Sequence, residues 1–239
     1  MKYTFYIFGL LILMFISCKQ QQENQTSKVD PFSIIAKSTD LAGGIENWNF
    51  KTEVKFGVNK VVYSGDKPYE KNEIHIYEFG DRAKKRISFE DDAGSLKTYA
   101  QLSGQYFSFT NEVEDTLQNS SFLAKEMNAA YLLSCVPFSI SELEGQMVYM
   151  GVDSVTHTEL SELVVINGDS EKWWFYFSQD SGMLLSFIHL ANGVKIEHVI
   201  KARQDFNGFT LPVYIKRYNI LKGKKKLLED VYVGNRTFK

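Results

Sequence analysis

Residues 184–220 read LLSFIHLANGVKIEHVIKARQDFNGFTLPVYIKRYNI, and this stretch decides the fold class. Its three apolar, β-branched runs are separated by the pairs Asn192-Gly193 and Asn207-Gly208. Asn-Gly suits a type I′ turn, because both of its residues tolerate positive φ. The stretch therefore predicts two consecutive β-hairpins in an antiparallel sheet.

The same kind of pattern extends in both directions. A first strand is expected from about residue 50, where apolar and polar residues begin to alternate. Further strands are expected at 72–80, 83–90, 95–102, 105–111, 145–153, 159–167, 171–178, 183–190, 194–203, 209–220 and 225–234. One helix is expected from Pro31 to the Gly43-Gly44 pair, and a second from residues 119–121 to Pro137.

About 11 to 12 strands are more than a flat open sheet usually holds without curling. We therefore expect a mainly β (α+β) fold. Its core would be a strongly curved antiparallel sheet or unclosed half-barrel, with two helices on the concave side.

The N-terminus has the form of an export signal. Lys2 precedes an apolar run over residues 3–17, which as a helix would reach only about 22 Å against roughly 30 Å of bilayer hydrocarbon. Residues 1–17 are therefore expected to be a cleaved signal peptide. The segment Phe15-Ile16-Ser17-Cys18 resembles a bacterial lipobox, which predicts acylation of Cys18 and stable membrane anchoring. The alternative is an apolar cysteine beside a conventional cleavage site.

The segment that follows Cys18 has the composition of a flexible tether. Residues 19–30 (KQQQENQTSKVD) contain no aromatic residue and only Val29 as an apolar one. Fully extended, they would span at most about 40 Å. Residues 31–239 contain no similar linker and are expected to form a single domain.

Charge and motif content argue against several classes of function. The chain has 27 Lys and Arg against 29 Asp and Glu, so it has no basic excess. Its one basic cluster, KGKKK at 222–226, is typical of a solvated hairpin turn. No nucleic-acid partner is therefore expected. Cys135 is expected to be a buried small hydrophobe. The histidines, His75, His157, His189 and His198, do not form a metal-binding motif, and no nucleophile elbow or phosphate loop is present. We expect no catalytic residue, metal or cofactor, and therefore no enzyme.

The aromatic residues point to a more specific function. The segment WWFYF at 173–177 places rings on both faces of one strand, so both faces should be covered. One face could line an apolar ligand cavity, or the strand could lie within an aromatic core; both interpretations remain open. The residues expected to line such a cavity are Trp173, Phe175, Phe177, Met127, Tyr131 and His198. The alternative for His198 is a partly buried histidine bonded to a neighbouring carbonyl.

Three stretches together resemble a family of uncharacterised Bacteroidetes lipoproteins, which is similar to the LolA-like carrier and sorting proteins of the bacterial periplasm. They are IIAKSTDLAGGIENWN (34–49), AAYLLSCVPFSI (129–140) and ARQDFNGFTLPVYIKRY (202–218). The first contains Gly43, Gly44 and Trp48, and the last contains the segment 205–212 that leads into a late strand.

This resemblance implies an unclosed barrel whose interior holds acyl chains or other lipids. We therefore expect a membrane-anchored envelope lipoprotein that binds a lipid or the acyl chains of a lipoprotein. Lys19 in place of Asp after Cys18 favours the outer membrane. The alternative is a protein-interaction or envelope-assembly module with a filled core and no ligand. The sequence leaves the oligomeric state open.

Overall fold

The computed structural model describes residues 29–65, 67–79, 84–91, 93–115, 120–169 and 171–239. The predicted signal peptide, Cys18 and nearly all of the predicted tether lie outside the described residues. Residues Pro31–Lys239 form one compact unit, which contains every residue of the hydrophobic core.

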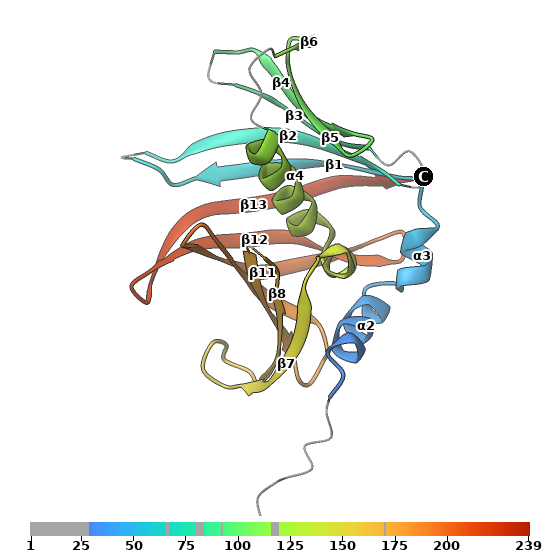
Figure 1. The fold of residues 1–239 in the computed structure, drawn as a ribbon, viewed down its shortest axis with the longest axis vertical. Helices are drawn as coiled ribbons and strands as arrows, with labels where there is room; N and C mark the ends of the chain where they lie inside the picture. The colour runs from blue at the N-terminus through green and yellow to red at the C-terminus, as the bar shows by residue number, and fades with distance from the viewer. Residues whose placement is uncertain (1–28, 66, 80–83, 92, 116–119, 170) are drawn as a thin grey trace, which may run out of the picture. The chain divides into compact units, whose positions relative to one another are not determined.

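Thirteen strands form one antiparallel sheet within the described residues (Figure 1). The first six are β1 (Glu53–Val62), β2 (Tyr69–Glu78), β3 (Lys84–Glu90), β4 (Leu96–Leu102), β5 (Gln105–Thr110) and β6 (Val113–Glu114). The others are β7 (Gln146–Asp153), β8 (Ser161–Asn167), β9 (Glu171–Ser178), β10 (Leu184–Ala191), β11 (Val194–Phe206), β12 (Phe209–Leu221) and β13 (Lys224–Phe238). Their spatial order is β6-β5-β4-β3-β2-β1-β13-β12-β11-β10-β9-β8-β7, so the sheet ends at β6 and β7 and is not closed.

The described helices are α2 (Pro31–Leu41), α3 (Ile45–Asn49), α4 (Ser120–Cys135) and the single 3₁₀ segment η1 (Phe138–Glu142). Helix α4 follows β6, lies across the concave side of the curved sheet and leads through η1 into β7 (Figure 1). The chain thus passes from one edge of the sheet to the other along α4. Within the described residues, no helix is long and apolar enough to cross a bilayer.

The predicted fold class, a mainly β unclosed half-barrel, is confirmed. The structure differs in detail, because the two-residue β6 and the five-residue α3 are too short to give a periodic sequence pattern. The first predicted helix ends just before the Gly43-Gly44 pair, as expected, and the short α3 follows the pair.

The Asn-Gly turns form as predicted. Asn192, Gly193, Asn207 and Gly208 all have φ between 52° and 85°, as a type I′ turn requires. The basic run 222–226 also forms a hairpin turn, since Lys222 and Gly223 have positive φ between β12 and β13. These local signals fixed the pairing of β10 with β11, of β11 with β12 and of β12 with β13.

Two of the stretches that carry the family resemblance meet in space. The amide of Thr210 donates to the carbonyl of Ala42 over 3.0 Å, and the indole of Trp48 packs edge-on against Phe209 at a centroid distance of 5.6 Å. Gly43 approaches the turn so closely that a Cβ there would lie 2.3 Å from the carbonyl oxygen of Gly208. Glycine at position 43 is therefore required by this contact, and it joins the α2–α3 corner to the β11–β12 turn.

The core fills the end of the concave side that lies next to α3 and η1. Trp48 stacks on Phe138 with parallel rings 4.5 Å apart, and Phe138 packs edge-on against Phe209. The sheet supplies further buried side chains, among them Val54, Phe56, Phe175, Phe177, Phe187, Leu211, Ile215, Val231 and Val233. This end of the half-barrel is packed solid by side chains, in the manner of an ordinary protein interior.

Candidate functional site

The concave side contains a cavity of about 720 Å³ between α4 and the sheet. One wall is the face of α4 that carries small residues, including Ala124, Asn128 and Ala129. The opposite wall comes from β9 and β10 through Trp173 and His189, and the segments next to β7 and β8 close one side. A volume of this size lies in the range of small-molecule and cofactor sites.

The lining of the cavity is amphipathic. Its apolar part comes from Tyr131, Leu132, Leu143 and Trp173. Its charged and titratable part is formed by Lys85, Lys125, Glu142, Glu144, Asp169, Glu171 and His189. An amphiphile that carries both a hydrocarbon portion and a polar group matches this lining better than a pure hydrocarbon would, because polar groups lose hydration when they are buried without partners.

The residues that the sequence singled out as cavity lining divide into two groups. Trp173 and Tyr131 line the cavity. Phe175, Phe177 and Met127 are completely buried, and His198 is 5% exposed. These last four belong to the packed interior next to the cavity, with His198 stacked on Phe187 at 4.4 Å. The structure therefore brings together only part of the predicted set.

One wall of the cavity is fixed by a cluster of Tyr131, Glu142 and Lys85. The Tyr131 hydroxyl donates to Glu142, whose carboxylate also lies 3.6 Å from the Lys85 ammonium. The same ammonium sits 4.0 Å from the centre of the Tyr131 ring. Burial, followed by the negative charges near it, raises the pKa of Tyr131, so its hydroxyl remains a donor. These contacts connect α4, η1 and β3 and hold the phenol ring in place.

The other wall presents a stack of His189 on Trp173. The two rings are nearly parallel with centroids 3.7 Å apart, and Nε2 of His189 lies 3.1 Å from a carboxylate oxygen of Glu171. Burial lowers the pKa of His189, while the charge of Glu171 opposes this shift. Both residues line the cavity, so the wall carries an aromatic surface with a titratable group at its edge.

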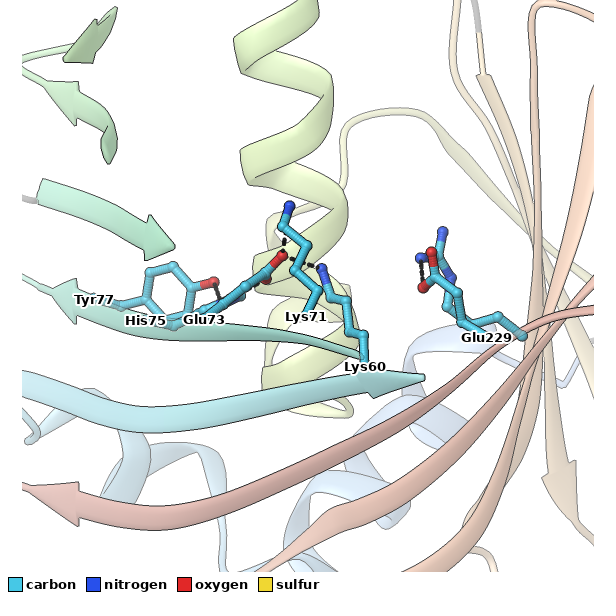
Figure 2. Close-up of polar contacts among 7 residues, drawn as sticks. Lys60, Lys71, Glu73, His75, Tyr77 and Glu229 are labelled. Carbon is cyan, nitrogen blue, oxygen red and sulfur yellow. Dashed lines mark hydrogen bonds and ion pairs between the residues drawn. The ribbon is translucent and has the colours of Figure 1, made fainter. Parts of the chain in front are cut away.

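Behind Tyr131 lies a buried polar network on β1 and β2. One carboxylate oxygen of Glu73 accepts from Lys60 over 2.7 Å and lies 3.2 Å from Lys71. The other lies 2.8 Å from Nε2 of His75, whose Nδ1 lies 2.9 Å from the Tyr77 hydroxyl. Figure 2 shows these side chains pointing toward one another from the two strands.

The pKa values of the network follow from its burial. Burial by itself raises the pKa of Glu73, but the hydrogen bond from His75 and the charge of Lys60 outweigh it and hold this pKa well below its usual range. Burial lowers the pKa of His75 despite the opposing effect of Glu73. A neutral His75 then donates from Nε2 to the carboxylate and accepts from the Tyr77 hydroxyl at Nδ1.

This network is connected to the cavity wall through aromatic rings. The ring of Tyr77 packs edge-on against Tyr131 at 4.8 Å, and His75 packs against Phe56 at 5.3 Å. Tyr77 is completely buried, so the Glu73–His75–Tyr77 chain does not reach a solvent-filled space. A group that no substrate can contact cannot act as a general base, so we regard the network as a support for the cavity wall.

A second Glu–cation pair, Arg217 with Glu229, lies on β12 and β13 (Figure 2). The positive charge of Arg217, after burial, contributes to the lowered pKa of His198. Nδ1 of His198 has no hydrogen-bond partner within the described residues. The alternative for His198, a partly buried histidine bonded to a neighbouring carbonyl, stays a prediction.

Other groups of possible chemical interest are enclosed. Cys135 is buried, and burial raises the pKa of its thiol, so it is protonated and unreactive at neutral pH. Nε2 of His157 lies 2.8 Å from the Ser186 hydroxyl, but Ser186 is completely buried. Among the described residues, no group of three or more His, Cys, Asp and Glu side chains could hold a metal ion.

Sequence reasoning did not identify Glu73, His75 or Tyr77 as members of a concave-side network. In the segment NEIHIYEFG, the apolar Ile74 and Ile76 alternate with these polar residues. Ordinary alternation places the apolar set inward. The structure reverses that order, and Ile74 is half exposed. The sequence did contain a signal for this network. Glu73, His75 and Tyr77 occupy every second position, so their side chains lie on one face of the strand and can hydrogen-bond to one another.

No protein-family model and no curated protein matches the sequence. Solved structures do match the fold. A LolA-superfamily protein from Nitrosomonas europaea aligns with a TM-score of 0.60 at 10% identity, over 88% of this chain and 94% of that one. A DUF1329-family protein from Desulfovibrio piger aligns with a TM-score of 0.59 at 11% identity, over the same shares of the two chains.

A third structure is a putative outer membrane lipoprotein-sorting protein domain from Vibrio parahaemolyticus. It aligns with a TM-score of 0.54 at 6% identity, over 86% of this chain and 93% of that one. At these identities the likeness concerns the fold. The chain has a LolA-like fold, as its sequence resemblance predicted.

Proposed function

We propose that this protein is a non-catalytic envelope lipoprotein, anchored by acyl chains on Cys18, that binds an amphiphilic ligand between α4 and the sheet. The ligand is a lipid or the acylated end of a lipoprotein. The observation that carries the proposal is the cavity of about 720 Å³, which combines an aromatic and aliphatic wall with charged groups. The outer membrane is the proposed site of anchoring, on the basis of Lys19.

The fold supports this proposal indirectly. Two of the structures with the same fold are described as a LolA-superfamily protein and as a lipoprotein-sorting domain. Hydrocarbon placed against Trp173 and Leu132 would gain about 0.8 kcal/mol per buried methylene, which would provide the affinity. The polar part of the ligand would lie near Lys125 and His189, at the charged side of the lining.

An interaction or envelope-assembly module without ligand is the second candidate. The observation in its favour is that Phe175, Phe177 and Met127 are completely buried in the packed core. A carrier that accommodates long acyl chains would need this part of the interior to open.

The test uses residues 19–239, which retain the whole core, purified without detergent. Native mass spectrometry would be used to detect bound lipid, and a fluorescent fatty-acyl probe to measure uptake. An Ala124→Trp variant fills the cavity from α4 and should abolish uptake. Ala36→Trp, at an exposed position of α2, serves as the control and should bind normally. The absence of lipid and of probe uptake in the unmodified chain would favour the interaction module.

A further inference from the structure

The open edge of the sheet at β7 offers a surface that the proposed cavity ligand does not use. In the described residues β7 pairs only with β8, so the backbone groups on its other side have no strand partner. A sheet edge with unpaired N–H and C=O groups is a template for an additional strand. The segment QMVYMGVD contains no Lys, Arg or Pro, the residues that commonly protect such an edge.

The geometry of the edge limits where a strand could be added. A bulge falls between Tyr149 and Gly151, and the φ of Gly151 is 98°. The residue at the bulge, Met150, is 61% exposed. Because a bulge bends the strand, the regular part available for pairing is 146–149, which follows directly from Glu144 and Gly145 of the cavity lining. Helix α2 also contacts β7, yet Gln146 remains exposed.

The chain on either side of this edge strand is rich in acidic residues. No Lys or Arg occurs between Lys125 and Lys172. The acidic residues in the interval are Glu126, Glu142, Glu144, Asp153, Glu159, Glu162, Asp169 and Glu171. Of these, Glu142 lies 3.6 Å from the Lys85 ammonium and Glu171 lies 3.1 Å from Nε2 of His189, whereas Glu144, Glu162 and Asp169 form no ion pair with any described Lys or Arg.

From the open strand and the acidic residues without cationic partners beside it, we propose that the β7 edge binds an extended, Lys- or Arg-rich segment of a partner protein as an added strand. Backbone hydrogen bonds to 146–149 would provide affinity, and the acidic side chains would select a basic segment. The bound segment would run past Glu144 and Asp169, which also line the cavity, so its end would lie at the cavity entrance.

The partner proposal does not require that the cavity holds a ligand, and its test is separate. Residues 19–239 would be titrated with a labelled peptide of alternating Lys and Thr, about ten residues long, which can form an extended strand. A peptide with the same number of lysines in Lys-Lys-Pro-Pro repeats, called the Lys-Pro peptide, has the same charge but lacks backbone donors on both sides of the strand, and a peptide of alternating Glu and Thr has the opposite charge. Binding would be followed by fluorescence anisotropy and by hydrogen exchange across β7.

We expect the Lys-Thr peptide to bind and to protect β7 amides, and the other two peptides to bind at least about tenfold more weakly. The double variant Glu144→Lys with Asp169→Lys should reduce the binding of the Lys-Thr peptide by a similar factor. Glu46→Lys, on α3 and outside both β7 and the cavity lining, should leave it unchanged.

Three results would overturn the proposal. Equal binding of the Lys-Pro peptide would show that charge alone is responsible. Unchanged binding by the double variant would place the peptide elsewhere. A dimer in solution that the double variant converts to a monomer, with no peptide binding, would assign the edge to a second copy of this chain.

Discussion

Nδ1 of His75 lies 2.9 Å from the hydroxyl oxygen of Tyr77, two residues further along β2, and both side chains are fully enclosed. The contact completes a chain that begins at Lys60 and Glu73 and ends against the Tyr131 ring. In a buried site a hydrogen-bonding group without its partner costs more than the bond itself contributes.

Replacing Tyr77 by Phe should therefore destabilise the fold. The substitution removes the donor to His75 and should lower the free energy of unfolding by about 1–3 kcal/mol. Urea unfolding of Tyr77→Phe and of the control Tyr69→Phe, which lies at an exposed position of the same strand, measures the difference. Equal stability of the two variants would show that the His75–Tyr77 bond does not contribute.

Stability should fall as the solution is acidified. Burial lowers the pKa of both His75 and His198, so below about pH 6.5 the unfolded chain takes up protons that the folded chain does not. Each of these histidines contributes a slope of up to about 1.4 kcal/mol per pH unit. Glu73, whose pKa is depressed in the folded chain, adds a further loss below its ordinary pKa of 4.5.

Denaturant unfolding between about pH 7.5 and pH 5.5 tests this dependence. His198→Phe preserves the aromatic stack on Phe187 and removes one titrating group, so its unfolding free energy should vary less with pH than that of the unmodified chain. A variant with the same slope as the parent would mean that His198 does not carry the effect.

Gly43→Ala should be one of the most damaging small substitutions in the chain. Gly43 has a φ of 119°, and the new Cβ would lie 2.3 Å from the Gly208 carbonyl oxygen. We expect a loss of about 3 kcal/mol or more, from backbone strain and from the displaced β11–β12 turn. Gly223→Ala also has positive φ but meets nothing within 4 Å, so its loss should be only about 1 kcal/mol. Thermal or urea unfolding that ranks the two equally would contradict the role of the contact.

Cys18→Ala should release the protein from the membrane fraction. The prediction follows from the lipobox-like segment at residues 15–18, and it requires no change in the fold, because the core lies within 31–239. Fractionation of cells together with circular dichroism of the purified variant measures both outcomes. If the variant still needed detergent for extraction, acylation at Cys18 would not be the anchor.

The sequence predicted those parts of the structure that depend on neighbouring residues. The turns at Asn192-Gly193 and Asn207-Gly208, and with them the order β10 to β12, follow from the conformational freedom of two residues. The end of α2 at the Gly43-Gly44 pair was equally local. The reason why Gly43 must be glycine was not visible, because the carbonyl that it meets belongs to Gly208.

The candidate site was harder to predict for a related reason. Alternation along β9 correctly placed Trp173, Phe175 and Phe177 on one face. The alternation could not indicate that α4 leaves a cavity above Trp173, whereas other side chains cover Phe175 and Phe177. That distinction depends on the path of α4 across the sheet, which is set by the positions of β6 and β7 at opposite edges. Small residues on α4 at 124 and 129 are consistent with a cavity only once that path is known.

The pairing of β1 with β13 also has a consequence for biosynthesis. The ribosome makes β1–β6 long before it makes β13, so the inner side of β1 stays without a partner until β13 has been made. β13 joins the two halves of the sheet at its centre, and loss of β13 would divide the sheet instead of shortening it. Pairing of strands so far apart in the sequence is slow to form and leaves aggregation-prone edges exposed meanwhile. A nascent chain of this topology benefits from being kept unfolded until β13 is available.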